Sequence, residues 1–164
     1  MESINELDQA AFVERFGPLF EHSPWVAAHA WHDRPFADAD ELFEALRSAM
    51  YEAPPERQVA LIAAHPDLAG KAAVEGTLTS RSEREQASAG LDRLTPDEYA
   101  GFTRMNSQYR ERFGFPFIVC VREHTKESIL RVAAERLAHT RDEEVRVALE
   151  EIGKIAKLRL EEVL

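Results

Sequence analysis

Apolar residues recur three and four positions apart through most of this chain, which is the spacing of an α-helix with one buried face. The clearest helix follows Thr95–Glu98, where T-P-D-E supplies a cap, a proline and an acid, and it is expected to end at Gly114. Only Phe115–Val121 resembles a strand, and it has no second strand-like run to pair with. We therefore predict an all-α fold, a helical bundle in which this run is an extended or helical lining of the interior.

Caps, prolines and the apolar spacing together set the expected helix boundaries. The predicted helices are Asp8–Phe16, Pro24–His32, Asp38–Glu52, a helix from Pro55 to His65, Thr79–Leu94, Thr95–Arg112, Thr125–His139 and Asp142 to the end. A chain of 164 residues suits one hydrophobic core, so we expect a single domain over residues 1–164.

Charge and composition exclude several classes of partner. A net charge of −10 disfavours a nucleic-acid phosphate backbone, so no nucleic acid is expected. No apolar run approaches the ~20 residues that cross a membrane, and the start M-E-S-I-N-E-L-D lacks the apolar core of a secretory signal. The single cysteine, Cys120, cannot form an internal disulfide and fits a reducing compartment. We expect a cytoplasmic protein without a membrane partner.

Two polar residues occupy positions where the helical spacing calls for an apolar one. His65 follows Leu61 by four and stands at the point where Pro66 stops a helix, and Arg159 follows Ile155 by four. A histidine there is often a satisfied core residue, and an arginine near a chain end can extend its head to solvent. Taken together, a buried base and a buried cation indicate a pocket for a small anion.

A polar cluster, S-R-S-E-R-E-Q, lies between these two positions. Ser82 and Glu85 have the spacing of a helix capping box, which is a structural explanation for both. A capping box does not account for Gln86, and it leaves one carboxylate oxygen of Glu85 available for other contacts. Cys120 is expected to be a small buried apolar residue rather than a nucleophile, because no histidine is near it in sequence.

His29 and His32 are three residues apart and would share a helical face, as two ligands of a metal do. No Asp, Glu or Cys at matching spacing completes the shell, so an exposed helix flank is the favoured interpretation. A metal-dependent hydrolase that uses His29 and His32 stays an alternative, as does a non-enzymatic helical interaction domain.

Four motifs carry a resemblance to a known family: A-A-H-P-D-L-A-G-K, S-R-S-E-R-E-Q-A-S-A-G-L, N-S-Q-Y-R-E-R-F-G-F-P-F-I-V-C-V and K-I-A-K-L-R-L. They resemble the decarboxylase of 2-oxo-4-hydroxy-4-carboxy-5-ureidoimidazoline (OHCU), an enzyme of urate degradation within purine catabolism. The resemblance extends from E-H-S-P-W at Glu21 to Arg159. It implies an all-helical homodimer that converts the small-molecule substrate to (S)-allantoin without a cofactor or a metal.

The resemblance also implies the residues of the site. Its catalytic positions match His65, Glu85 and Arg159, and its substrate-binding positions match Pro66, Ser82, Glu83, Arg84, Glu85, Gln86, Phe117, Ile118, Val119, Cys120 and Val121. Ser82, Glu85 and Gln86 share a helical face, so Glu83 and Arg84 would contribute mainly their backbone.

Overall fold

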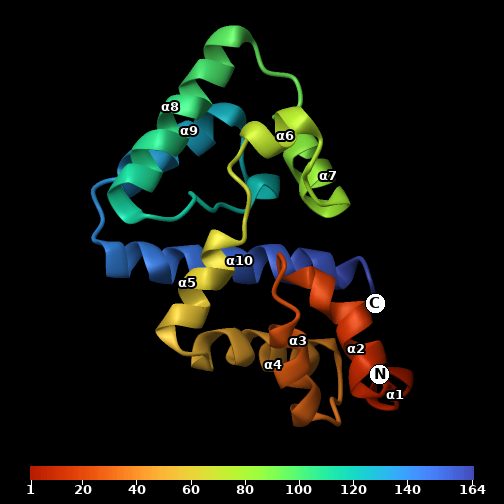
Figure 1. The fold of residues 1–164 in the computed structure, drawn as a ribbon. Helices are drawn as coiled ribbons and strands as arrows, with labels where there is room; N and C mark the ends of the chain where they lie inside the picture. The colour runs from red at the N-terminus through yellow and green to blue at the C-terminus, as the bar shows by residue number, and fades with distance from the viewer. The chain divides into compact units, whose positions relative to one another are not determined.

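The computed structural model describes the backbone of residues 1–164 and every side chain except those of residues 71 and 72 (Figure 1). Its regular elements are helices, and no strand occurs in this described part, which confirms the all-α prediction. The α-helices are α1 (Glu2–Asn5), α2 (Gln9–Phe16), α3 (Trp25–Ala30), α4 (Ala39–Glu52), α5 (Pro55–Ala63), α6 (Lys71–Glu75), α7 (Ser80–Ser88), α8 (Pro96–Phe113), α9 (Lys126–Arg136) and α10 (Arg141–Glu161). Short 3-10 helices are η1 (Gly17–Leu19), η2 (Trp31–Asp33) and η3 (Val121–Glu123).

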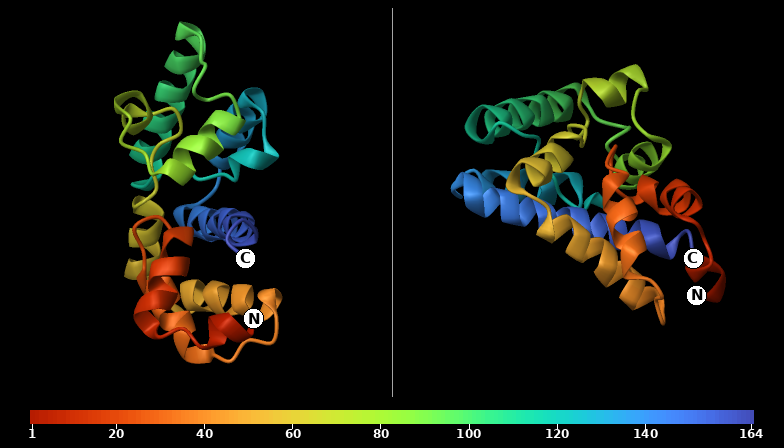
Figure 2. Two further views of the ribbon diagram at one scale, coloured as in Figure 1. Left: turned by 90° about the vertical axis from the view of Figure 1, so that its right-hand side faces the viewer. Right: turned by 60° about the horizontal axis from the view of Figure 1, so that its bottom comes forward.

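The helices form two compact units, and α10 contributes to both. The first unit contains residues 1–64 and 152–164, and the second contains residues 65–151. In the first unit α3 packs against α2 and α4, and in the second α8 packs against α9 (Figure 2). Among the described residues, none of the helices combines the length and the apolar character that a membrane span requires.

Helix α8 matches its sequence prediction closely. The Thr95 hydroxyl accepts the Glu98 N–H, and the Glu98 carboxylate accepts the Thr95 N–H, so both members of the predicted cap are formed. Gly114 ends the helix at φ +80°, a left-handed conformation that glycine adopts without steric cost. The buried face of α8 consists of Phe102, Met105, Asn106, Tyr109 and Phe113.

Helix α7 begins at the predicted Thr79, which is its N-cap, but it ends earlier than the sequence predicts. Its cap is Thr79, whose hydroxyl accepts the Ser82 N–H at 3.3 Å, so the capping-box assignment of Ser82 and Glu85 is wrong. Both residues lie inside the helix instead. The helix ends at Ser88 rather than Leu94, because Gly90 turns the chain at φ +76°.

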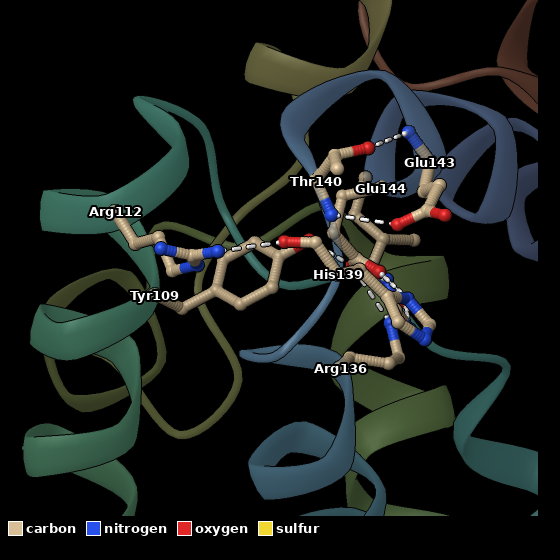
Figure 3. A network of polar contacts seen from close by, with 8 residues as sticks. Tyr109, Arg112, Arg136, His139, Thr140, Glu143 and Glu144 are labelled. Atoms are coloured by element: carbon tan, nitrogen blue, oxygen red, sulfur yellow. Dashed lines mark hydrogen bonds and ion pairs between the residues drawn. The ribbon is translucent and has the colours of Figure 1, made fainter.

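A buried network of charges lies in the second unit, where α8, α9 and α10 meet (Figure 3). The Glu144 carboxylate is fully buried and accepts the Tyr109 hydroxyl and the Arg136 Nε–H, the latter at 2.7 Å. His139 Nδ1 lies 2.8 Å from Oε2, the second carboxylate oxygen of Glu144. Burial and the bond to Glu144 raise the pKa of Tyr109, so its hydroxyl keeps its proton.

The same network holds the apolar run Phe117–Val121, whose residues are buried and lie outside any helix until η3 begins at Val121. Arg136 Nη1 donates to the Ile118 carbonyl at 2.6 Å, and Glu151 Oε2 accepts the Cys120 N–H at 2.8 Å. The predicted interior position of this run is therefore confirmed, and its backbone is not helical up to Cys120. Two residues of α10 hold this run in place. Glu144 acts through Arg136, and Glu151 binds the run directly.

Replacing Glu144 by alanine should destabilise the protein strongly, because it leaves the Arg136 guanidinium buried without an anion. We expect a loss of about 3–5 kcal/mol in the free energy of unfolding, measured by urea denaturation. The neighbouring Glu143→Ala is the matched control: Glu143 is exposed and its carboxylate accepts the Thr140 N–H at the start of α10, so about 1 kcal/mol or less should be lost. Equal losses in the two variants would contradict the account.

Cys120 should react slowly with thiol reagents while the protein is folded. Burial raises the pKa of its thiol to about 11, and the nearby carboxylates of Glu123, Glu151 and Glu85 add to the effect. Against a pKa of 9.0 for a free thiol, this leaves about 100-fold less of the reactive thiolate at pH 8. Iodoacetamide labelling in buffer and in urea measures the difference, and equal rates would contradict the burial of Cys120.

Candidate active site

His65 follows Ala64, the C-cap of α5, and is the first residue of the second unit. Its side chain is 7% exposed, so the sequence prediction of a buried histidine is confirmed. Pro66 disfavours a helical conformation at His65, and α5 ends at Ala63. The segment from His65 to Gly70, called the His65 loop below, leads from there towards α6.

Helix α7 presents three of the predicted residues on one buried face. Ser82, Glu85 and Gln86 are buried, whereas Glu83 and Arg84 are exposed. This division follows from the helical period, because positions three and four apart share a face. The structure therefore agrees with the expectation that Glu83 and Arg84 offer little beyond their backbone to a buried ligand.

Gln86 connects this face to the His65 loop. Its Oε1 accepts the Ala69 N–H at 2.9 Å, and its Nε2 lies 3.5 Å from the Asp67 carbonyl, at the limit of a hydrogen bond. The side-chain amide that the resemblance assigns to the substrate is thus also a structural link of the protein. A role in substrate binding must be compatible with these two contacts.

The run Phe117–Val121 is the third predicted part of the site in this unit. Helix α7 packs against η3, which begins at the end of the run, so the run and the buried face of α7 are neighbours. The single proton of the Cys120 N–H is bonded to Glu151, so that amide cannot donate to a substrate at the same time. Any backbone donor that this run offers must come from its other residues.

Arg159 lies in the first unit, whereas the other predicted site residues lie in the second. It is 2% exposed, so the alternative in which its head reaches solvent is wrong. Its Nη1 donates to the Leu19 carbonyl at 3.1 Å, and its Nη2 donates to Glu21 Oε1 at 2.8 Å. Glu21 is itself buried, so the anion that compensates this cation is in part the protein's own carboxylate.

Sequence reasoning missed the partners of the predicted residues. Glu21 stands in the E-H-S-P-W motif, but nothing in its spacing shows that it pairs with a residue more than a hundred positions away. Glu144 and Glu151 both lie on the buried face of α10. Each is a carboxylate at a position where the helical spacing calls for an apolar residue. A polar residue at an apolar position is also the pattern that indicates His65 and Arg159, so the same pattern could have identified both glutamates.

His29 and His32 are exposed. His32 lies against Trp31 and near the side-chain amide of Gln9. Across the side chains that the structure describes, no cluster of three or more His, Cys, Asp or Glu is arranged to hold a metal ion. The exposed-flank interpretation of this pair agrees with their surroundings.

The second unit thus combines a buried imidazole, a carboxylate, a hydroxyl and an apolar wall. His65, Glu85 and Ser82 supply the polar groups, and Phe117–Val121 supplies the wall. An imidazole and a carboxylate shielded from water are groups suited to acid–base chemistry on a small polar molecule.

Comparison with known proteins agrees with this chemistry. The 2-oxo-4-hydroxy-4-carboxy-5-ureidoimidazoline decarboxylase of Haloferax volcanii is 44% identical over 162 residues, which are 99% of this chain and 94% of that protein. The protein of the same name from Mus musculus is 39% identical over 164 residues, or 100% of this chain and 92% of that protein.

Two crystal structures resemble the fold. That of (S)-allantoin synthase superposes with a TM-score of 0.78 at 28% identity over 99% of this chain, which spans about half (53%) of the synthase chain. That of OHCU decarboxylase in the presence of (S)-allantoin gives a TM-score of 0.73 at 20% identity, over 90% of this chain and 94% of that one, and supports the fold alone. Residues 5–161 match the sequence profile described as OHCU decarboxylase. The chain therefore belongs to the OHCU decarboxylase family.

Proposed function

We propose that this protein is a carboxy-lyase that decarboxylates OHCU to (S)-allantoin in urate degradation. The observation that carries the proposal is the match to relatives of that name over nearly their whole length and nearly all of this chain. The buried histidine and carboxylate of the second unit support it, since the reaction needs acid–base groups shielded from water.

The substrate supplies its own electron sink. The carbon that bears the carboxylate and the 4-hydroxyl lies next to a C=N bond. When the C–C bond to the carboxylate breaks, carbon dioxide leaves and the electron pair moves into the imine, ending on its nitrogen. The nitrogen takes up one proton from solvent. The 4-hydroxyl then loses its proton as its oxygen becomes the carbonyl of allantoin, and the electron pair of the new C=C bond takes a proton onto the neighbouring carbon, on one face. The reaction therefore needs no cofactor, only groups that orient the substrate and transfer protons.

His65 is the proposed general base and acid. Imidazole can both accept and donate a proton near neutral pH, which suits removal of the 4-hydroxyl proton and its return to carbon. Glu85 is proposed to pair with the hydroxyl or with His65 and to set its protonation state. Ser82, Gln86, Pro66 and the unbonded backbone of Phe117–Val121 are proposed to contact the ureido group and the ring.

Arg159 is proposed to hold the substrate's anionic or carbonyl oxygens, as its match in the family resemblance implies. Its bonds to Leu19 and Glu21 orient the planar guanidinium, and an oriented guanidinium is a stronger donor than one that must first be ordered. Glu21 is therefore proposed to act through Arg159 rather than on the substrate.

We further propose that the enzyme is a homodimer in the cytoplasm. The family resemblance supports the dimer, and a single cysteine that stays buried as a free thiol is compatible with a reducing compartment. Sedimentation equilibrium checks the dimer, and a mass that stays at one chain across micromolar concentrations would contradict it.

His65→Ala should lower kcat by roughly 10²-fold or more, the usual size of an acid–base contribution. The substrate is unstable, so it is generated in situ from urate by the two preceding activities, and its loss is followed by absorbance together with released carbon dioxide. His29→Ala is the matched control, because His29 is exposed, and it should keep normal turnover. Loss of activity in His29→Ala but not in His65→Ala would instead favour the metal-dependent alternative.

Removing the Arg159 cation should weaken binding of allantoin by about tenfold or more, the loss expected for a charge-assisted hydrogen bond. Arg159→Ala alone would leave Glu21 buried and uncompensated, so the test uses the double variant E21Q/R159Q, which replaces the ion pair by a neutral pair. The single variant E21Q keeps the cation and should bind better than the double variant in calorimetry. A dissociation constant in the double variant equal to that of the unaltered protein would limit Arg159 to a structural role.

A further inference from the structure

The His65 loop adopts a backbone conformation that its own sequence does not favour. Ala69 has φ +49°, in the left-handed region where a residue with a Cβ pays about 1–2 kcal/mol. The next residue must be glycine, because a Cβ on Gly70 would stand 2.7 Å from the Cβ of Asp67. Such a conformation persists only where surrounding groups impose it.

Two buried side-chain amides impose it, one from each side of the loop. Gln86 of α7 accepts the Ala69 N–H at 2.9 Å, and Asn106 of α8 donates from Nδ2 to the Leu68 carbonyl at 2.8 Å. These bonds engage consecutive residues at the point where the backbone is strained. The contact of Gln86 Nε2 with the Asp67 carbonyl, at 3.5 Å, extends the same link by one residue.

Asn106 is placed on α8 where only a specific contact explains a polar residue. It is 7% exposed and shares the buried face of the helix with Phe102, Met105 and Tyr109. Its Oδ1 has no hydrogen-bond partner among the described residues, which costs about 1–3 kcal/mol that an apolar residue would avoid. The hydrogen bond from Asn106 Nδ2 to the Leu68 carbonyl offsets this cost.

One turn further along α8, Arg110 holds the beginning of the same loop. Its Nε donates to both Asp67 carboxylate oxygens, at 2.9 and 3.2 Å. Arg110 is 45% exposed, so this ion pair contributes less than the buried bond of Asn106. Helix α8 therefore contacts the loop through Asn106 and Arg110, and its Tyr109 packs against the buried rings of Phe115 and Phe117.

We propose that Asn106 is a positioning residue for His65. With Gln86 it holds the strained loop in one conformation and so determines where the adjoining imidazole lies. Asn106 need not touch the substrate. The inference rests on the proposed role of His65 as the acid–base group. A misplacement of about 1 Å in such a group can cost up to ~10²-fold in rate, so a displaced loop should be visible in turnover.

Asn106→Leu keeps the branched shape of the side chain and removes the donor to Leu68. We expect kcat to fall by at least about tenfold with KM changed less than about threefold, and the pH dependence of kcat to shift or broaden. The matched control is Asn5→Leu in the first unit, since Asn5 also holds a loop, through two bonds of 2.9 Å to Phe36. That variant should lose stability without changing kcat or its pH profile.

Arg110→Gln provides a second variant if Asn106→Leu fails to fold, because Arg110 is at the surface. It should lower kcat about two- to threefold, while Arg104→Gln, exposed on the same helix, should not. An unaltered protein that does not turn over OHCU would overturn the proposed function itself. An active protein whose folded Asn106→Leu variant, or failing that its Arg110→Gln variant, keeps normal kcat and pH profile would overturn the positioning role and leave the proposed function standing.

Discussion

Buried charge must be compensated inside a protein, and this requirement organises both units of the chain. In the second unit, the fully buried Glu144 brings together Tyr109 of α8 and Arg136 of α9, and Arg136 then holds the Ile118 carbonyl. In the first unit, the same requirement pairs Arg159 of α10 with Glu21. The Tyr109–Glu144 and Arg159–Glu21 contacts connect residues 35 and 138 positions apart, so each fixes tertiary structure that helical packing alone would leave less specific.

The candidate site depends on these connections rather than on regular structure. His65 lies in a loop and residues 117–120 lie outside any helix, so neither segment is held by the hydrogen bonds of a helix. The protein holds both by side chains from neighbouring helices: amides of Gln86 and Asn106 for the loop, and Arg136 and Glu151 for the run. Such irregular segments can present backbone groups and an imidazole at angles that a helix face does not allow.

Much of the fold could be predicted from the sequence, because helix starts and buried faces are local properties. Thr95–Glu98 and Gly114 mark α8 as the structure has it, and the burial of His65, Arg159 and Cys120 follows from apolar spacing. The capping box predicted for Ser82 and Glu85 in α7 is wrong, because T-S-R-S-E-R-E contains two overlapping cap signals and the helix uses the earlier one, Thr79.

The partners of the buried polar residues could not be predicted in the same way. The pairing of Arg159 with Glu21 and the bond of Asn106 to Leu68 depend on how segments distant in sequence pack together. Such contacts produce no repeating pattern in the sequence. Gln86 shows the consequence for function. Its position on the buried face of α7 follows from the helical spacing, but its bond to the loop that begins at His65 does not.

The handedness of the product tests the account most directly, because only a substrate held in one orientation can receive its proton on one face. The protein is added to OHCU formed in situ from urate, and circular dichroism follows the allantoin as it appears. We expect rapid accumulation of dextrorotatory (S)-allantoin. Racemic allantoin formed at the rate of spontaneous decay would contradict it.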